Sequence, residues 1–178
     1  GITQFRLTGG EPLLRMDLED VVAQLNGLRA KGLERISMTS NGTLLAKRAQ
    51  ALVDAGVDDF NISLDALDES VFTRLTKADI HPVLAGIDAA RATGVSVKIN
   101  TVLVRGYNDD QVLPLLEWAM AKNLPLRFIE YMPLDEPGRW QRQSVMDEDA
   151  VLAILRSRHR VEKLARSSDP ASPYLVDG

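Results

Sequence analysis

Apolar and polar positions follow a repeating pattern along the chain: an apolar run, a polar turn, an amphipathic segment, a glycine, and the next apolar run. Short apolar runs predict strands, whereas apolar residues three and four positions apart predict helices with one buried face. Strands are therefore expected over residues 2–7, 35–39, 60–64, 95–104 and 126–132. Helices are expected over about 18–28, 45–53, 68–75, 81–93, 112–119 and 147–155.

Five strands that alternate with helices predict an α/β fold with parallel strands joined by right-handed crossovers. The strands are rich in apolar residues, which favours a sheet covered on both faces. A doubly wound sheet and a barrel both fit this pattern, and both bind ligands at the carboxyl ends of their strands. The 178 residues suffice for a single domain, and the Ser-, Pro- and Asp-rich residues 167–178 are expected to form an irregular tail.

Composition excludes several classes of function. The net charge of −4 argues against a protein that binds nucleic acid or anionic membranes, because such a protein would carry a basic surface. No apolar run approaches the roughly 20 residues of a membrane span, and the first residues do not resemble a signal peptide, so a cytoplasmic location is expected. The chain has no cysteine and two histidines, which predicts no disulfide and no transition-metal site built from these residues alone.

The first predicted strand runs into the segment 6–15, Arg-Leu-Thr-Gly-Gly-Glu-Pro-Leu-Leu-Arg. Without side chains, Gly9 and Gly10 would let a ligand lie directly against the backbone. Glu11 would then place a carboxylate where it can hold an ammonium group. A plain turn with a solvated Glu11 explains the same residues, and the motif alone does not decide between the two interpretations.

Polar residues gather at or near the carboxyl ends of the predicted strands, and three cations, Arg6, Lys98 and Arg127, lie inside strands. Burying a cation without a partner is costly, so each needs a counter-charge. The partners are either carboxylates of the chain or an anionic ligand such as a nucleotide phosphate. The candidate carboxylates are those of Glu11, Asp65 and Glu130.

Segment 6–15 resembles the Gly-Gly-Glu-Pro segment of radical S-adenosylmethionine (SAM) enzymes, in the form found in the GTP 3′,8-cyclase family of molybdenum cofactor biosynthesis. Gly-Gly-Glu-Pro alone indicates only the superfamily, but the similarity continues in the same order and covers most of residues 1–165. The further matching segments are 39–42, 61–65, 98–102, 106–109 and 127–132.

This resemblance implies a partial, TIM-like (βα)6 barrel that binds SAM and GTP inside, at the carboxyl ends of the strands. It implies SAM contacts from Gly10, Ser63 and Met132, and GTP contacts from Arg6, Thr39 and Lys98. The family converts GTP to (8S)-3′,8-cyclo-7,8-dihydroguanosine 5′-triphosphate, the first step of molybdopterin biosynthesis, by SAM-derived radical chemistry.

The family also uses two [4Fe–4S] clusters held by cysteines, and this chain has none. The resemblance therefore implies a central segment without the first strand and the C-terminal cluster region, inactive by itself. The open sheet edges predict self-association, and the intact protein is expected to form a homodimer. Two alternatives stay open: a cysteine-free scaffold that binds SAM or a nucleotide, and an unrelated barrel enzyme for phosphorylated sugars with Lys98 as a Schiff-base or proton-transfer lysine.

Overall fold

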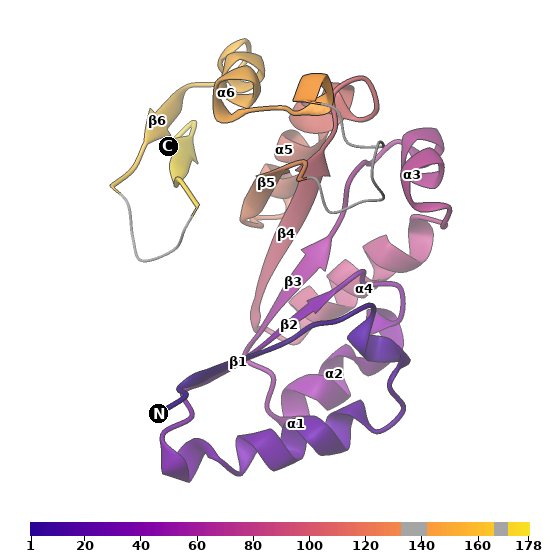
Figure 1. Ribbon diagram of the computed structural model, residues 1–178, viewed down its shortest axis with the longest axis vertical. Helices are drawn as coiled ribbons and strands as arrows, with labels where there is room; N and C mark the ends of the chain where they lie inside the picture. Colours follow the sequence, from indigo (N-terminus) through magenta and orange to yellow (C-terminus); the bar gives the residue numbers. More distant parts are fainter. Residues whose placement is uncertain (133–141, 166–170) are drawn as a thin grey trace.

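The computed structural model describes residues 1–132, 142–165 and 171–178 (Figure 1). Its main element is a sheet of five parallel strands, and a separate antiparallel pair lies near the carboxyl terminus. The strands of the main sheet are β1 (Gln4–Leu7), β2 (Arg35–Ser40), β3 (Asp59–Ser63), β4 (Ser96–Leu103) and β5 (Leu126–Glu130). The pair consists of β6 (Val161–Lys163) and β7 (Tyr174–Val176).

The helices lie where the apolar spacing predicts them, and sequence signals explain their ends. Asp68 and Asp147 cap two helices by accepting hydrogen bonds from the backbone N–H groups of Val71 and Ala150. The α-helices are α1 (Leu18–Asn26), α2 (Leu45–Ala55), α3 (Glu69–Thr76), α4 (His81–Ala92), α5 (Val112–Ala121) and α6 (Glu148–Arg156). Short 3-10 turns are η1 (Pro12–Leu14), η2 (Arg29–Lys31), η3 (Asp109–Gln111) and η4 (Arg142–Ser144).

The order of the strands decides between the two folds that the sequence left open. In the main sheet the strands follow one another as β1-β2-β3-β4-β5, all parallel. A doubly wound sheet reverses its order at a switch point, whereas a barrel adds each strand beside the previous one. The α/β prediction is confirmed, and the sheet is an open part of a barrel.

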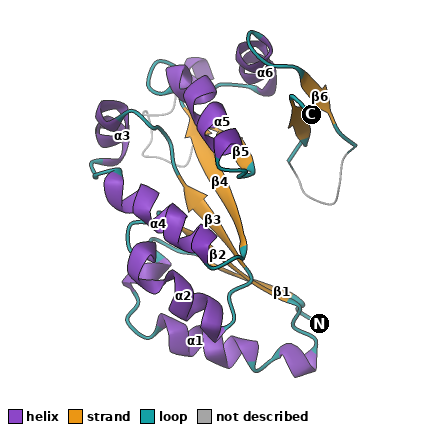
Figure 2. Ribbon diagram, turned by 180° about the vertical axis from the view of Figure 1, so that it is seen from behind, coloured by secondary structure: helices purple, strands orange, loops and turns teal. Residues whose placement is uncertain are grey.

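The helices cover one face of this sheet. Buried strand residues such as Ile36, Phe60 and Ile99 occupy alternate positions and join one apolar core with residues of the helices. In Figure 2, seen from behind, α4 and α5 lie in front of the strands, while Figure 1 shows the opposite side. The expectation of a sheet covered on both faces is therefore wrong, because the strands alternate between apolar and polar side chains.

Two further expectations differ from the structure. The first helix ends at Asn26, and η2 carries the chain on to Gly32, whose positive φ of 99° ends the turn. The tail over 167–178 was expected to be irregular, but residues 174–176 form β7 because they pair with β6 in antiparallel register. Residues 167–170 of that tail lie outside the described residues. Across the described ranges, no helix combines the length and the apolar character that crossing a membrane requires.

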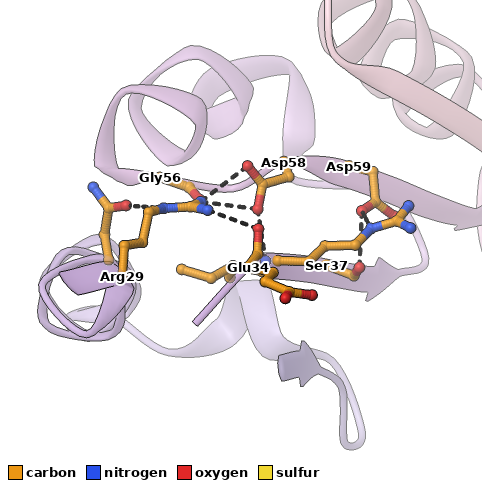
Figure 3. Close-up of polar contacts among 9 residues, drawn as sticks. Arg29, Glu34, Ser37, Gly56, Asp58 and Asp59 are labelled. Atoms are coloured by element: carbon orange, nitrogen blue, oxygen red, sulfur yellow. Dashed lines mark hydrogen bonds and ion pairs between the residues drawn. The ribbon is translucent and has the colours of Figure 1, made fainter. Parts of the chain in front are cut away.

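The amino ends of β2 and β3 are held by a polar network centred on Arg29 (Figure 3). Its guanidinium donates to the backbone oxygens of Glu34 and Gly56 at 2.9 and 3.0 Å and to the Asp58 carboxylate at 2.9 Å. Asp58 in turn accepts the backbone N–H of Ile36 at 2.7 Å. Beside this network, Asp59 is buried and accepts hydrogen bonds from Arg35 and Ser37. The charges at this end of the sheet are therefore used to support the fold.

Candidate functional site

The face of the sheet that the helices leave open carries a row of polar side chains. The register pairs Thr39 on β2 with Asn61 on β3, and Asn61 with Lys98 on β4. Neighbouring strands are about 4.8 Å apart, so these three side chains lie next to one another on one face. Asn61 is buried, whereas Thr39 and Lys98 are half-buried.

Arg6 belongs to the same face. It pairs in register with Ser37, which lies two positions before Thr39 on β2, so Arg6 and Thr39 point to the same side of the sheet. Arg6 lies on the edge strand β1 and is exposed. The structure thus places all three residues predicted to contact GTP, Arg6, Thr39 and Lys98, on one open polar face.

Arg6 and Lys98 have no ion pair or hydrogen bond with any residue that the structure describes. Glu11 and Asp65, two carboxylates considered as their partners, bind elsewhere: Glu11 to the end of β2 and Asp65 to the backbone of β4. These contacts favour an anionic ligand as the counter-charge of the half-buried Lys98, whereas the exposed Arg6 is solvated by water and stays available for the same ligand.

The turn after β1 exposes bare backbone. Gly9 and Gly10 are exposed, and a Cβ atom built on either would meet no other atom within 4 Å. Gly9 has a φ of 141°, which a side chain would strain, whereas Gly10 has no such restriction. The backbone of this turn is therefore open to approach, and a ligand contact there stays a prediction.

Glu11 makes three hydrogen bonds within the protein. Its carboxylate accepts the Ser40 hydroxyl at 2.9 Å, the backbone N–H of Asn41 at 2.7 Å and the backbone N–H of Leu13 at 3.0 Å. It caps η1 and ties the turn after β1 to the carboxyl end of β2. Glu11 thus fixes the position of the two glycines, and its contact with an ammonium group stays a prediction.

The three residues predicted to contact SAM lie along the carboxyl edge of the sheet. Gly10 follows β1, Ser63 is the last residue of β3, and Met132 follows β5 with 52% of its surface exposed. Parallel strands bring their carboxyl ends to one edge, so these residues face a common rim from three different strands. Ser63 pairs with Asn100 on β4, one row beyond Lys98.

Asp65 lies at the same end of β3 and is half-buried. Its Oδ1 accepts the backbone N–H of Val102 at 2.8 Å. Burial raises the pKa of Asp65 above its ordinary value, because desolvation outweighs this hydrogen bond.

The raised pKa of Asp65 gives a prediction about stability. A carboxyl whose pKa is raised by folding stabilises the protein below its unfolded pKa, and that contribution is lost as the pH rises through the folded pKa. Asp65→Asn keeps an oxygen for Val102 and cannot ionise, so it is expected to be more stable than the wild type at pH 7. The advantage should shrink toward pH 4, as measured by urea unfolding at both pH values. A variant that is less stable at pH 7 would show that the ionised carboxylate is stabilised by another group.

The residues of this chain do not fit an iron–sulfur cluster. Such clusters are held by cysteine thiolates, and the sequence contains no cysteine. The described residues also contain no group of three His, Asp or Glu side chains arranged to hold a metal ion.

The comparison with protein families decides the superfamily. The family model described as the radical SAM superfamily matches residues 1–119. The chain belongs to the radical SAM superfamily. This match overturns the alternative of an unrelated barrel enzyme for phosphorylated sugars. The strand register agrees, because a Schiff-base or proton-transfer lysine needs an acid or base beside it, and the neighbour of Lys98 on β3 is the neutral Asn61.

Within the radical SAM superfamily, the chain is similar to curated proteins named GTP 3′,8-cyclase. The chain is 40% identical over 167 residues to a GTP 3′,8-cyclase of Staphylococcus saprophyticus, covering 93% of this chain and 48% of the relative. It is 38% identical over 164 residues to a GTP 3′,8-cyclase of Staphylococcus aureus, covering 91% and 48%. The chain thus spans about half the length of the curated relatives that it matches.

Solved structures confirm the fold of this radical SAM chain. A domain of pyruvate-formate lyase-activating enzyme from Bacteroides vulgatus gives a TM-score of 0.66 at 17% identity, covering 85% of this chain and 89% of the domain. Native anSMEcpe with bound AdoMet gives a TM-score of 0.63 at 22% identity, covering 79% and 41%. At these identities the likeness supports the partial barrel alone.

Sequence reasoning missed that Asn61 shares the open face with the predicted ligand residues. The signal was present in the strand around Asn61, where residues 59–65 alternate strictly between polar and apolar side chains. Read with a period of two, this stretch predicts one polar face and one core face.

Proposed function

We propose that this chain is the central part of a GTP 3′,8-cyclase and that its open polar face binds GTP and SAM. One observation carries the proposal: Arg6 and Lys98 point to the same open face beside Thr39 and have no partner among the described residues. Two unpaired cations on a surface of hydroxyl and amide groups suit a nucleotide triphosphate. The names of the curated relatives support GTP as that nucleotide.

In this proposal Lys98 and Arg6 bind the phosphates from β4 and β1, and Thr39 donates a hydrogen bond between them. A lysine acts as a compact point charge on a flexible stem, while an arginine presents several donors in a plane. The half-buried position of Lys98 strengthens its attraction for phosphate, because water screens it less than an exposed charge.

SAM would lie along the rim of the sheet, with its methionine end against Gly10, its middle near Ser63 and its adenine beside the backbone at Met132. The open space around Gly10 fits this group, since nothing blocks approach to the backbone there. When bound, SAM supplies the adenosyl radical that starts chemistry in this superfamily. The residues of this chain bind and orient the two ligands and limit the access of water.

Gly10→Ala tests the SAM part of the proposal. An added Cβ would meet no protein atom within 4 Å and Gly10 has no positive φ, so the variant should fold as stably as the wild type. Its methyl group would instead occupy the space of the ligand, and we expect SAM affinity to fall about tenfold or more. Calorimetric titration with SAM measures this. A variant that binds SAM as tightly as the wild type would contradict the contact.

The reaction itself is tested by segment replacement. We expect a chimera, in which this chain replaces the matching part of the Staphylococcus saprophyticus enzyme, to convert GTP to the cyclised nucleotide when both clusters are reconstituted anaerobically. A chimera that folds and carries its clusters but leaves GTP unchanged would contradict the proposed reaction. We further propose that the intact protein works in the cytoplasm and as a homodimer.

A further inference from the structure

Two consecutive backbone oxygens directly after β3 accept hydrogen bonds from side chains. The Thr101 hydroxyl donates to the backbone oxygen of Leu64 at 2.6 Å. The side-chain amide of Asn108 donates to the backbone oxygen of Asp65 at 2.8 Å. Both donor side chains are completely buried. In a continued strand, backbone N–H groups of the neighbouring strand would bind such oxygens, so side chains hold the chain here where β3 has ended. We refer to Thr101 and Asn108 as the β3 clamp.

Asn108 uses its whole side-chain amide. Its nitrogen also donates to the backbone oxygen of Val102 at 2.9 Å, and its oxygen accepts the backbone N–H of Val104 at 2.8 Å. One side chain therefore ties the carboxyl end of β4 to the chain after β3. Asn108 belongs to segment 106–109, which resembles the cyclase family in sequence but includes none of the residues expected to contact a ligand.

Ser63, the last residue of β3, depends on the β4 side for its position. On the β2 side the last registered pair is Ser40 with Ile62, so Ser63 extends one residue beyond that ladder. On the β4 side Ser63 pairs with Asn100, and Leu64 donates its N–H to the backbone oxygen of Asn100 at 2.9 Å. The contacts of the residues that follow Ser63 therefore determine how it faces the rim of the sheet.

We propose that the β3 clamp positions Ser63 for its contact with SAM, an inference that rests on the function proposed above. The clamp residues act through Ser63 and are positioning residues, not ligand contacts. The residues assigned to GTP lie inside paired strands, so their positions do not depend on the clamp; they are Arg6, Thr39 and Lys98. Loss of the clamp should therefore weaken SAM binding and leave GTP binding unchanged.

Thr101→Val and Thr101→Ser separate positioning from support of the fold. Valine keeps the shape of threonine and removes the hydroxyl, whereas serine keeps the hydroxyl and removes a methyl group. Both variants should unfold at a lower temperature than the wild type, because the first leaves a buried acceptor unpaired and the second leaves a small cavity. In calorimetric titrations, we expect Thr101→Val to bind SAM about threefold to tenfold more weakly and GTP as the wild type does. Thr101→Ser should bind both ligands like the wild type.

Thr93→Val is the matched control. The Thr93 hydroxyl also donates to a backbone oxygen at 2.6 Å, that of Ala90 at the end of α4, so the control makes the same chemical change away from the rim. It should change neither affinity. Asn108→Ala removes the second member of the clamp and should weaken SAM binding alone. Because Asn108→Ala also loses two contacts with β4, Thr101→Val decides the proposal if Asn108→Ala does not fold.

Three results would overturn the positioning role. They are a Thr101→Val variant that binds SAM as tightly as the wild type, a Thr101→Ser variant that loses as much SAM affinity as Thr101→Val, and a parallel loss of SAM and GTP binding. Each would mean that the β3 clamp supports the fold alone. A wild type that binds no SAM would overturn the proposed SAM site itself. That result concerns the unchanged protein, so the two failures are distinguishable.

Discussion

Lys98→Met is expected to weaken GTP binding about tenfold to a hundredfold. The side chain lies half-buried on the open face, beside Asn61, and no described residue pairs with its charge. A hydrogen bond between charged groups contributes about 1.5–3 kcal/mol, which corresponds to that range in affinity. Methionine keeps the length and apolar stem of lysine and removes the ammonium group. Calorimetric titration with GTP at low and high salt measures the loss, which should be larger at low salt.

The control for Lys98→Met is Lys47→Met, on the exposed side of α2. It makes the same chemical change away from the open face and should leave GTP affinity unchanged. Both variants should unfold within about 0.5 kcal/mol of the wild type, since neither lysine has a partner in the described structure. If Lys98→Met binds GTP normally, or if it unfolds much more easily, Lys98 supports the fold and does not bind phosphate.

Gly86→Ala is expected to have the largest effect on stability. Gly86 lies in α4, where a Cβ atom would come to 2.1 Å from the backbone oxygen of Gly42 and 3.1 Å from Cβ of Leu45. The first distance is far inside van der Waals contact with a backbone atom, so α4 would have to move away from the turn before α2. Overpacking of this kind costs about 1–3 kcal/mol and occasionally more, and we expect a loss of about 3 kcal/mol or more.

Urea unfolding of Gly86→Ala, compared with Gly10→Ala, measures this cost. Both variants add one methyl group to a glycine without a positive φ, but Gly10 has open space where Gly86 has a backbone oxygen. Alanine favours a helix over glycine by about 1 kcal/mol, so a Gly86→Ala variant as stable as the wild type would mean that α4 and α2 are less closely packed than described.

Much of the fold could be predicted from the sequence, because local signals and tertiary packing agree. Apolar spacing placed the helices, and capping residues such as Asp68 and Asp147 mark their starts. The prediction from the sequence was wrong about the number of covered faces, because strands rich in apolar residues can still alternate between apolar and polar side chains. The pairing of β2 with β3 shows this alternation. Phe60 lies beside Met38 on the core face, and Asn61 lies beside Thr39 on the open face.

The candidate site was predicted in part. The resemblance named Arg6, Thr39 and Lys98, and the register places them on one face. The use of Glu11 could not be read from the sequence, since its hydrogen bonds to Ser40 and Asn41 join segments about 30 positions apart. The pairing of β6 with β7 is likewise a long-range contact, which composition of the tail does not reveal.

The most direct test of the account is the location of bound ligand on the molecule. Amide chemical shifts of the protein, recorded during titration with GTP and then with SAM, report which residues each ligand touches. We expect GTP to shift the amides of Arg6, Thr39 and Lys98, and SAM to shift those of Gly10 and Ser63. Amides of the network at the opposite end of the sheet, such as Arg29 and Asp58, should not move. Shifts that gather on the outer helices or around Arg29, with the open face unchanged, would contradict the account.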